Sequence, residues 1–353
     1  MALRKYLYSL MTDRRCGLAA GIGKFFLCLL SLGYGGIVRC VRALYAFGVL
    51  PSWRAPRPVI SIGNITVGGT GKTPLAIAVA QAFLLRQLRV GIVIRGYMPG
   101  SGNGFSDEVR MLQEHLPGVP VLAGANRRLS IEECLKHHAV DAFICDDAFQ
   151  HWPLHRDLDI VAVDAVNPFG NGWLLPRGIL REPPRALQRA QIIVLTKTDH
   201  PRADVQALRG RLAGLNPQAL IVESRHACAG YVDVFTKKAH DLYHLKGVSV
   251  VAFCAIADPN SFRQSLQEAG FNVANIFVFM DHHVYTQEDL DPVRNFAMDH
   301  HIQMILTTHK DAVKIQPFQA FWQGYRLYFL QVELEITHGK NVFIERIVSA
   351  VRH

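Results

Sequence analysis

The stretch VISIGNITVGGTGKTP, residues 59–74, decides the fold class. An apolar run is followed by a glycine-rich turn, Lys-Thr and a helical pattern, which is the context in which a phosphate-binding loop is meaningful. The backbone N–H groups of such a loop bind phosphate oxygens, aided by the positive end of the helix that follows. The usual pattern G-x-x-x-x-G-K-[ST] has Gly where this chain has Thr66. Because Gly68 and Gly69 give the turn its freedom, we expect a working nucleotide site despite Thr66.

The loop supplies the predicted nucleotide-binding residues. Lys72 is expected to reach the β- and γ-phosphates of a nucleoside triphosphate, and the Thr73 hydroxyl is expected to bind Mg²⁺. The full predicted set is Thr66, Val67, Gly68, Gly69, Thr70, Gly71, Lys72 and Thr73.

Short apolar runs alternate with helical patterns along the rest of the chain. Continuous Val, Ile and Leu runs indicate strands that are covered on both faces, and therefore a parallel sheet with crossover helices. The sequence predicts an α/β fold: a P-loop NTPase-type parallel-sheet core, a second smaller α/β domain and an N-terminal membrane-associated helix. The expected ranges are 1–57 for the N-terminal segment, 58–200 for the core, 201–247 for a connection and 248–353 for the smaller domain.

The N-terminal segment is both basic and apolar. Residues 1–57 hold nine Lys or Arg and one acid, so this segment carries +8 of the net +9. Within it lies FFLCLLSLGYGGIV, residues 25–38, between Lys24 and Arg39. That run is shorter than the ~18 residues that span a bilayer as a helix, unless flanking residues extend it. We therefore expect a segment that lies on the membrane among lipid headgroups, or a single N-terminal anchor.

The seven cysteines are scattered, and no C-x-x-C pair occurs. This pattern indicates neither a zinc site nor a disulfide framework and suits a reducing compartment. No nucleic-acid partner and no obligate protein partner are expected.

Three acidic or His-bearing segments follow strands or early loops. They are SDEV with Asp107 and Glu108, CDDAFQH with Asp146 and Asp147, and MDHHVYT with Asp281, His282 and His283. Ligands of open parallel sheets bind at the carboxyl ends of the strands, where such segments converge. Phosphoryl transfer needs metal ligands, a base near the acceptor and cations for the developing charge. The segment LLPRGILREPP, residues 174–184, offers Arg177 and Arg181 as such cations.

Taken together, these motifs resemble the tetraacyldisaccharide 4′-kinase family of lipid A biosynthesis. The resemblance is carried in order by ISIGNITVGGTGKTP, IRGY, DE, DDAFQHWPLHRDLDI, WLLPRGILREP, FCAIADPNSF, DHHVYT and KDAVK. It implies an enzyme on the cytoplasmic face of the bacterial inner membrane. Its reaction would transfer the γ-phosphate of ATP, with Mg²⁺, to the 4′-hydroxyl of a lipid-linked disaccharide 1-phosphate.

The resemblance also implies roles for the residues at matching positions. Asp107 would be the base, with His282 as its partner, and Lys72 and Arg181 would bind phosphate charge. Thr73, Glu108, Asp146 and Asp147 would serve the metal.

Three motifs depart from the usual family pattern. Ala148 stands in place of Gly in D-D-G-F-Q-H, and Arg177 and Ile179 alter the P-A-G-P-L-R-E-P loop. His309 replaces Glu in T-E-K-D, which puts a charge role for that position in doubt.

Two other interpretations compete with the kinase. A regulatory membrane-associated GTPase or ATPase is suggested by TKTD, residues 196–199, which resembles the N-K-x-D guanine reader. Thr196 stands where the guanine reader has Asn, and no D-x-x-G switch motif follows the phosphate loop. The other alternative is a non-catalytic membrane adaptor that only retains nucleotide binding.

Overall fold

The computed structural model describes residues 2–96, 107–242, 246–256, 259–281 and 283–352, without the side chains of residues 2–5, 107 and 108. Contacts divide the chain into two units. Unit 1 comprises Met1–Gly100, Gly118–Arg225 and Ile336–His353, and unit 2 comprises Ser101–Pro117 and His226–Glu335. Each unit is thus assembled from segments that lie far apart in the sequence.

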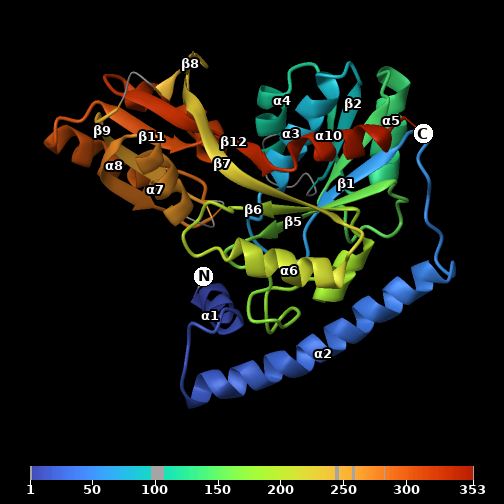
Figure 1. The fold of residues 1–353 in the computed structure, drawn as a ribbon. Helices are drawn as coiled ribbons and strands as arrows, with labels where there is room; N and C mark the ends of the chain where they lie inside the picture. The colour runs from blue at the N-terminus through green and yellow to red at the C-terminus, as the bar shows by residue number, and fades with distance from the viewer. Residues whose placement is uncertain (1, 97–106, 243–245, 257–258, 282, 353) are drawn as a thin grey trace. The chain divides into compact units, whose positions relative to one another are not determined.

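Unit 1 contains the phosphate-loop motif (Figure 1). Its elements are α1 (Ala2–Met11), α2 (Leu18–Ala46), β1 (Val59–Gly63), α3 (Lys72–Leu84), β2 (Val90–Arg95), β3 (Val121–Gly124), α5 (Arg127–His137), β4 (Ala142–Asp146), β5 (Leu158–Asp164), the 3₁₀ helix η1 (Pro184–Arg189), β6 (Ile192–Thr196), α6 (Val205–Leu215), the first part of β7 (Leu220–Asp233) and α10 (Lys340–Ser349).

The strands of unit 1 follow the order β7-β6-β5-β1-β4-β2-β3, and the neighbours pair in parallel. Every residue of β1, β4 and β6 is buried. Continuous apolar strands covered on both faces are what the sequence predicts, so the α/β class is confirmed. Because β1 lies inside the sheet, the loop that leaves its carboxyl end starts from a rigid base.

Helices α5 and α6 pack against the sheet of unit 1 through apolar clusters. Ile131 and Cys134 of α5 pack with Val59 and Phe143, and α6 contributes Leu208 and Leu212 to a second cluster. The side chain of Asn126 caps α5 by accepting hydrogen bonds from the backbone N–H groups of Arg128 and Leu129. Asn is among the residues preferred at this position, which explains why α5 begins there.

Unit 2 has its own core. Its elements are α4 (Asp107–His115), the second part of β7, β8 (Ala239–His240), β9 (Ser249–Cys254), α7 (Pro259–Glu268), β10 (Asn272–Val278), α8 (Gln287–Asp299), β11 (Met304–Thr308), α9 (His309–Ile315), the 3₁₀ helix η3 (Gln316–Trp322) and most of β12 (Arg326–His338). The strand order β10-β9-β11-β12 is parallel throughout. Buried aromatic rings, among them stacked Phe253 and Trp322, fill one face of this sheet.

The range 201–247, expected as a connection, contains regular structure. It holds α6, the long strand β7 and β8. The sequence HACAG in the middle of β7 has neither an apolar run nor strict alternation, so the strand has no strong local signal. Two of the four points at which the chain passes between the units lie within strands: after Arg225 in β7 and after Glu335 in β12.

Helix α2 extends beyond the apolar run that revealed it. It has 29 residues and a window of mean hydropathy 1.6, so by length and composition it could cross a membrane. Large apolar side chains remain exposed along it, including Phe25, Phe26, Leu30 and Ile37. With Leu18 and Ile22 also exposed, the apolar surface of the helix begins about two turns before the 25–38 run.

Candidate functional site

The phosphate loop joins β1 to α3 in unit 1. Gly68 and Gly71 have φ values of 118° and 81°, in the region that favours glycine. Gly71 immediately precedes Lys72, the first residue of α3. The loop therefore delivers its Lys-Thr pair to the positive end of a helix, as a phosphate site requires.

Thr66, the residue that departs from the usual motif, lies in paired backbone. It forms an antiparallel bridge with Leu180, next to hydrogen bonds from Val67 N to Ile179 O (2.8 Å) and from Arg181 N to Ile65 O (2.7 Å). Bridged backbone is extended, and a β-branched residue suits it better than glycine. The structure thus gives a physical reason for Thr at this position.

Three buried or half-buried polar side chains hold the phosphate loop through hydrogen bonds. Asn64 donates from Nδ2 to Thr70 Oγ1 at 2.9 Å, and Gln150 Nε2 donates to the carbonyl of Asn64 at 2.8 Å. Thr196 Oγ1 donates to the carbonyl of Thr70 at 3.2 Å. Thr196 opens the TKTD segment, so this part of the segment has a structural role in holding the loop.

Lys72 and Arg181 meet at one carboxylate, that of Asp147. Lys72 Nζ lies 3.5 Å from Asp147 Oδ1, and Arg181 Nη1 donates to both Asp147 oxygens at 2.8 Å. Burial raises the pKa of Asp147, but Lys72 and Arg181 beside it hold that pKa below its usual range. Asp147 is therefore ionised at neutral pH and brings two cations to the phosphate loop.

Asp146 lies next to the hydroxyl predicted to bind metal. Thr73 Oγ1 is 3.5 Å from Asp146 Oδ2, while Asp146 Oδ1 accepts a hydrogen bond from the backbone N of Asp147 at 2.8 Å. A hydroxyl and a carboxylate are the oxygen donors that Mg²⁺ prefers, so the residues present fit that ion. Within the described part of the chain, no group of three or more His, Cys, Asp or Glu is placed to hold a metal.

Arg127, at the start of α5, was not predicted from the sequence. It is 3% exposed, and its Nη2 donates to the carbonyls of Asp146 (2.7 Å) and Asp147 (3.0 Å). It thereby fixes the turn in which Asp147 takes a φ of 48°, a conformation uncommon outside glycine. The sequence signal that could have indicated Arg127 is its place after Asn126, at the start of the helix that follows strand β3.

Burial and nearby arginines also affect His151, the last residue of CDDAFQH. Burial, together with Arg127 and Arg156, lowers the pKa of His151 to about 4. This histidine is therefore neutral at physiological pH.

The departures from the family pattern have local explanations. Ala148 is fully buried, and in this segment the positive φ falls on Asp147. Arg177 Nη2 donates to Asp13 at 2.8 Å, and Ile179 supplies the carbonyl bound by Val67. None of these positions takes over a predicted role.

The predicted residues Asp107, Glu108 and His282 belong to unit 2. Asp107 begins α4, but the side chains of Asp107 and Glu108, and all of His282, lie outside the described residues. Next to His282, Asp281 pairs with Lys310 at 3.0 Å, and His283 Nε2 lies 3.0 Å from Asp289.

The C-terminal end of α4 is held by contacts of the Glu114 carboxylate with two side chains. Glu114 contacts Lys237 at 2.8 Å and His309 at 2.6 Å, and the His309 ring stacks on Phe329. Burial raises the pKa of Glu114, but the hydrogen bonds from His309 and Lys237 lower it to about 2 overall. Burial lowers the pKa of His309 and outweighs the effect of Glu114. His309 thus has a structural partner that the sequence did not indicate.

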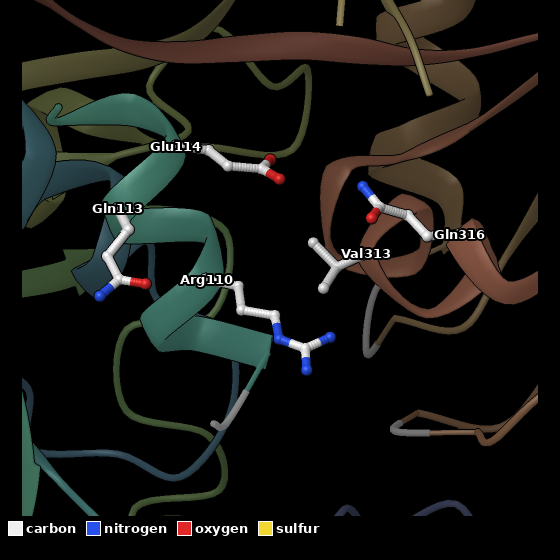
Figure 2. A pocket seen from close by; sticks show the side chains of 5 residues that line it. All are labelled: Arg110, Gln113, Glu114, Val313 and Gln316. Carbon is white, nitrogen blue, oxygen red and sulfur yellow. The ribbon is translucent and has the colours of Figure 1, made fainter. Parts of the chain in front are cut away.

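A shallow pocket of about 260 Å³ lies between α4 and the α9–η3 segment. Figure 2 shows its lining residues, Arg110, Gln113, Glu114, Val313 and Gln316. It contains none of the predicted site residues, so it is not the predicted nucleotide site.

Comparison with known proteins gives concordant matches. A family model described as Tetraacyldisaccharide-1-P 4′-kinase matches residues 23–352. A Tetraacyldisaccharide 4′-kinase of Anaeromyxobacter dehalogenans (strain 2CP-C) is 41% identical over 318 residues, covering 85% of this chain and 83% of the relative. One of Halothermothrix orenii is 34% identical over 364 residues, covering 95% and 94%.

A solved structure matches as well. The crystal structure of LpxK from Aquifex aeolicus in complex with ATP has a TM-score of 0.74 and 26% sequence identity, and covers 94% of this chain and 99% of that one. With a family match that spans nearly the whole sequence, this chain belongs to the tetraacyldisaccharide 4′-kinase family.

Proposed function

We propose that the chain is a kinase that transfers the γ-phosphate of ATP to the 4′-hydroxyl of tetraacyldisaccharide 1-phosphate, in lipid A biosynthesis. The observation that carries this proposal is the charge arrangement at the phosphate loop, where Asp147 brings Lys72 and Arg181 together. Two fixed cations at a phosphate loop are what phosphoryl transfer uses to stabilise charge on the transferred group. Family membership supplies the acceptor.

The backbone N–H groups of the loop, with Lys72, bind the phosphates of ATP. Lys72 reaches the β- and γ-phosphates as a point charge, while Arg181 offers a planar donor group to phosphate oxygens. Asp147 keeps both side chains directed to the loop, and Arg127 keeps Asp147 in place.

The proposed ligands of Mg²⁺ are Thr73, Glu108, Asp146 and Asp147. For Thr73 and Asp146, the short distance between their side-chain oxygens supports the assignment. When bound, Mg²⁺ offsets the negative charge of the phosphates. Asp107 accepts the proton of the acceptor hydroxyl, and His282 orients Asp107. A carboxylate is a sufficient base because the loose transition state requires little deprotonation before the new bond forms.

We also propose that the protein works at the cytoplasmic face of the inner membrane. The exposed apolar residues of α2 and the basic residues around them support this assignment, because they suit acyl chains and anionic headgroups. An enzyme held there is concentrated where its acylated acceptor resides.

The proposal is tested by nucleotide and lipid dependence. Full-length protein in mixed micelles is incubated with ATP or GTP, with and without the disaccharide 1-phosphate acceptor, and release of nucleoside diphosphate is followed. We expect release only with ATP and acceptor together. Release with GTP that does not depend on lipid would support the regulatory GTPase instead. Nucleotide binding with unchanged function in the Asp107→Ala variant would support the adaptor.

A further inference from the structure

One loop in unit 1, residues 171–182, contacts both the phosphate loop and α2. On the phosphate-loop side, Arg181 N donates to Ile65 O at 2.7 Å and Val67 N donates to Ile179 O at 2.8 Å. Thr66 and Leu180 form a bridge between these two bonds. The 171–182 loop therefore acts as a short added strand beside the segment that leads into the phosphate site.

On its other side, the 171–182 loop is bound by two hydroxyl groups of α2. Ser31 Oγ donates to Leu174 O at 2.9 Å, and the Tyr34 hydroxyl donates to Arg181 O at 3.0 Å. Ser31 and Tyr34 are three residues apart, so they lie on the same helix face. Ser31 is 3% exposed although α2 is largely exposed. This face of α2 is therefore a specific contact within unit 1.

A glycine lets the two backbones approach each other. A Cβ atom added at Gly35 would lie 2.9 Å from Leu174 Cδ1. Glycine inside a helix costs roughly 0.5–1 kcal/mol relative to alanine, so its presence here is consistent with the need for close contact.

A second contact holds the same loop near α1. Asp13 pairs with Arg177 of the loop at 2.8 Å and with Lys24 of α2 at 2.6 Å. Asn171 Nδ2 donates to the carbonyl of Met11 at 2.9 Å. The loop is thus fastened to the N-terminal segment at two separate points.

Arg181 connects these contacts to the site. Its backbone N–H binds Ile65, its backbone carbonyl accepts the Tyr34 hydrogen bond, and its guanidinium binds Asp147. Burial and the nearby Glu182 raise the pKa of Tyr34, so its hydroxyl stays a donor near neutral pH.

We propose that Tyr34 is a positioning residue through which the apolar helix α2 sets Arg181 at the phosphate loop. The helix then contributes to turnover as well as to membrane attachment. This inference rests on the proposed function, since it concerns the same phosphate site. It differs from a purely attaching role of α2, which requires no particular side chain on the face that contacts the loop.

The test compares full-length wild type with Tyr34→Phe and, as matched control, Tyr45→Phe. Tyr45 lies on the same helix about 16 Å further along at 1.5 Å per residue, and its ring stacks on that of Trp152. Turnover of the acceptor in mixed micelles, KM for the acceptor, the membrane-bound fraction and the thermal midpoint are measured for all three. Amide exchange at Val67 and Arg181 is measured without substrate.

We expect kcat of Tyr34→Phe to fall about fivefold, as for loss of one partly buried hydrogen bond. KM for the acceptor and membrane binding should match wild type, and amide exchange at Arg181 should rise. The thermal midpoint should fall by no more than about 2–4 °C, the shift that goes with losing about 1 kcal/mol of stability. Tyr45→Phe should match wild type throughout. A kcat for Tyr34→Phe equal to wild type would overturn the inference, as would equal losses in both variants or a change confined to KM.

A second variant, Gly35→Leu, tests the same contact in case the fall in kcat of Tyr34→Phe is small. Gly35→Leu should separate α2 from Leu174 and lower kcat more than Tyr34→Phe does, while membrane binding is kept. Unchanged kcat in this variant would also overturn the inference. If wild type itself lacks acceptor-dependent turnover, the proposed function fails, whereas the amide-exchange comparison still tests the contact between Tyr34 and Arg181.

Discussion

Each unit contains a carboxylate held between two basic side chains, and the two clusters differ in what those side chains are. Asp147 in unit 1 contacts Lys72 and Arg181. Glu114 in unit 2 contacts Lys237 and His309, and burial lowers the pKa of His309.

Both carboxylates have a lowered pKa, yet only Asp147 lies at a phosphate-binding motif. The Glu114 cluster instead fastens α4 to the rest of unit 2. A perturbed pKa therefore marks a functional site only together with neighbouring chemistry. The comparison separates a cluster at the phosphate loop, which we propose binds substrate phosphate, from one that holds a helix.

The largest effect is expected for Lys72→Ala. Removing this cation from the unit 1 cluster should lower turnover about 10²–10³-fold, because a fixed charge that stabilises the transferred phosphate is lost. Turnover with ATP and acceptor is the measurement. Lys136→Ala, at an exposed pair on α5, is the control and should match wild type. A loss below threefold would contradict the role of Lys72.

Asp147→Asn tests the unit 1 carboxylate itself. Without its negative charge, Lys72 and Arg181 repel each other and are no longer directed to the loop, so turnover should fall about 10–100-fold. Asp141→Asn, which breaks a surface pair with Arg89, should leave turnover unchanged. Equal turnover in the two variants would show that Asp147 is dispensable for placing the cations.

Glu114→Gln should change stability and its pH dependence. The pKa of Glu114 is lowered to about 2 from 4.5, so its stabilising effect is complete above about pH 4.5 and is lost as pH falls towards 2. The depressed pKa of His309 acts in the same direction, because the unfolded chain binds that proton more tightly as pH falls below about 6.5.

Thermal unfolding from pH 7 to pH 3 measures this effect. Glu114→Gln should be less stable than wild type by about 1 kcal/mol at neutral pH, and the difference should shrink on acidification. Glu133→Gln, at an exposed cluster on α5, serves as the control and should change neither value. Identical profiles for Glu114→Gln and wild type would remove the structural role assigned to the unit 2 cluster.

The smallest effect is expected for Thr66→Gly, which restores the usual motif. Because Thr66 is bridged to Leu180 in extended backbone, glycine should lower stability by about 0.5–1 kcal/mol and leave ATP affinity nearly unchanged. Denaturant unfolding and nucleotide titration check this. A marked gain in ATP affinity would mean that Thr66 is a defect of the loop.

The sequence predicted the site best where its residues are close together in the chain. The run from Val59 to Thr73 gave the strand, turn and helix, and the Asp146–Asp147 pair was recognised because it follows a buried strand. Family resemblance added Arg181, which the structure brings to Asp147.

What the sequence did not reveal depends on contacts between distant residues. Tyr34 and Arg181 are 147 residues apart in the chain, and Arg127 at the start of α5 donates to the carbonyl of Asp147 in the turn after β4. Neither residue has a local pattern that distinguishes it from an ordinary polar residue. Strand β7 was missed because its middle lacks regular periodicity, and its place is set by the strands on either side.

The most direct test of the kinase is the identity of its product. Full-length protein is incubated with ATP, Mg²⁺ and tetraacyldisaccharide 1-phosphate, and the lipid is analysed by tandem mass spectrometry. We expect one added phosphate, at the 4′ position, and none with Lys72→Ala. An unmodified lipid, or a phosphate added at another position, would contradict the assignment.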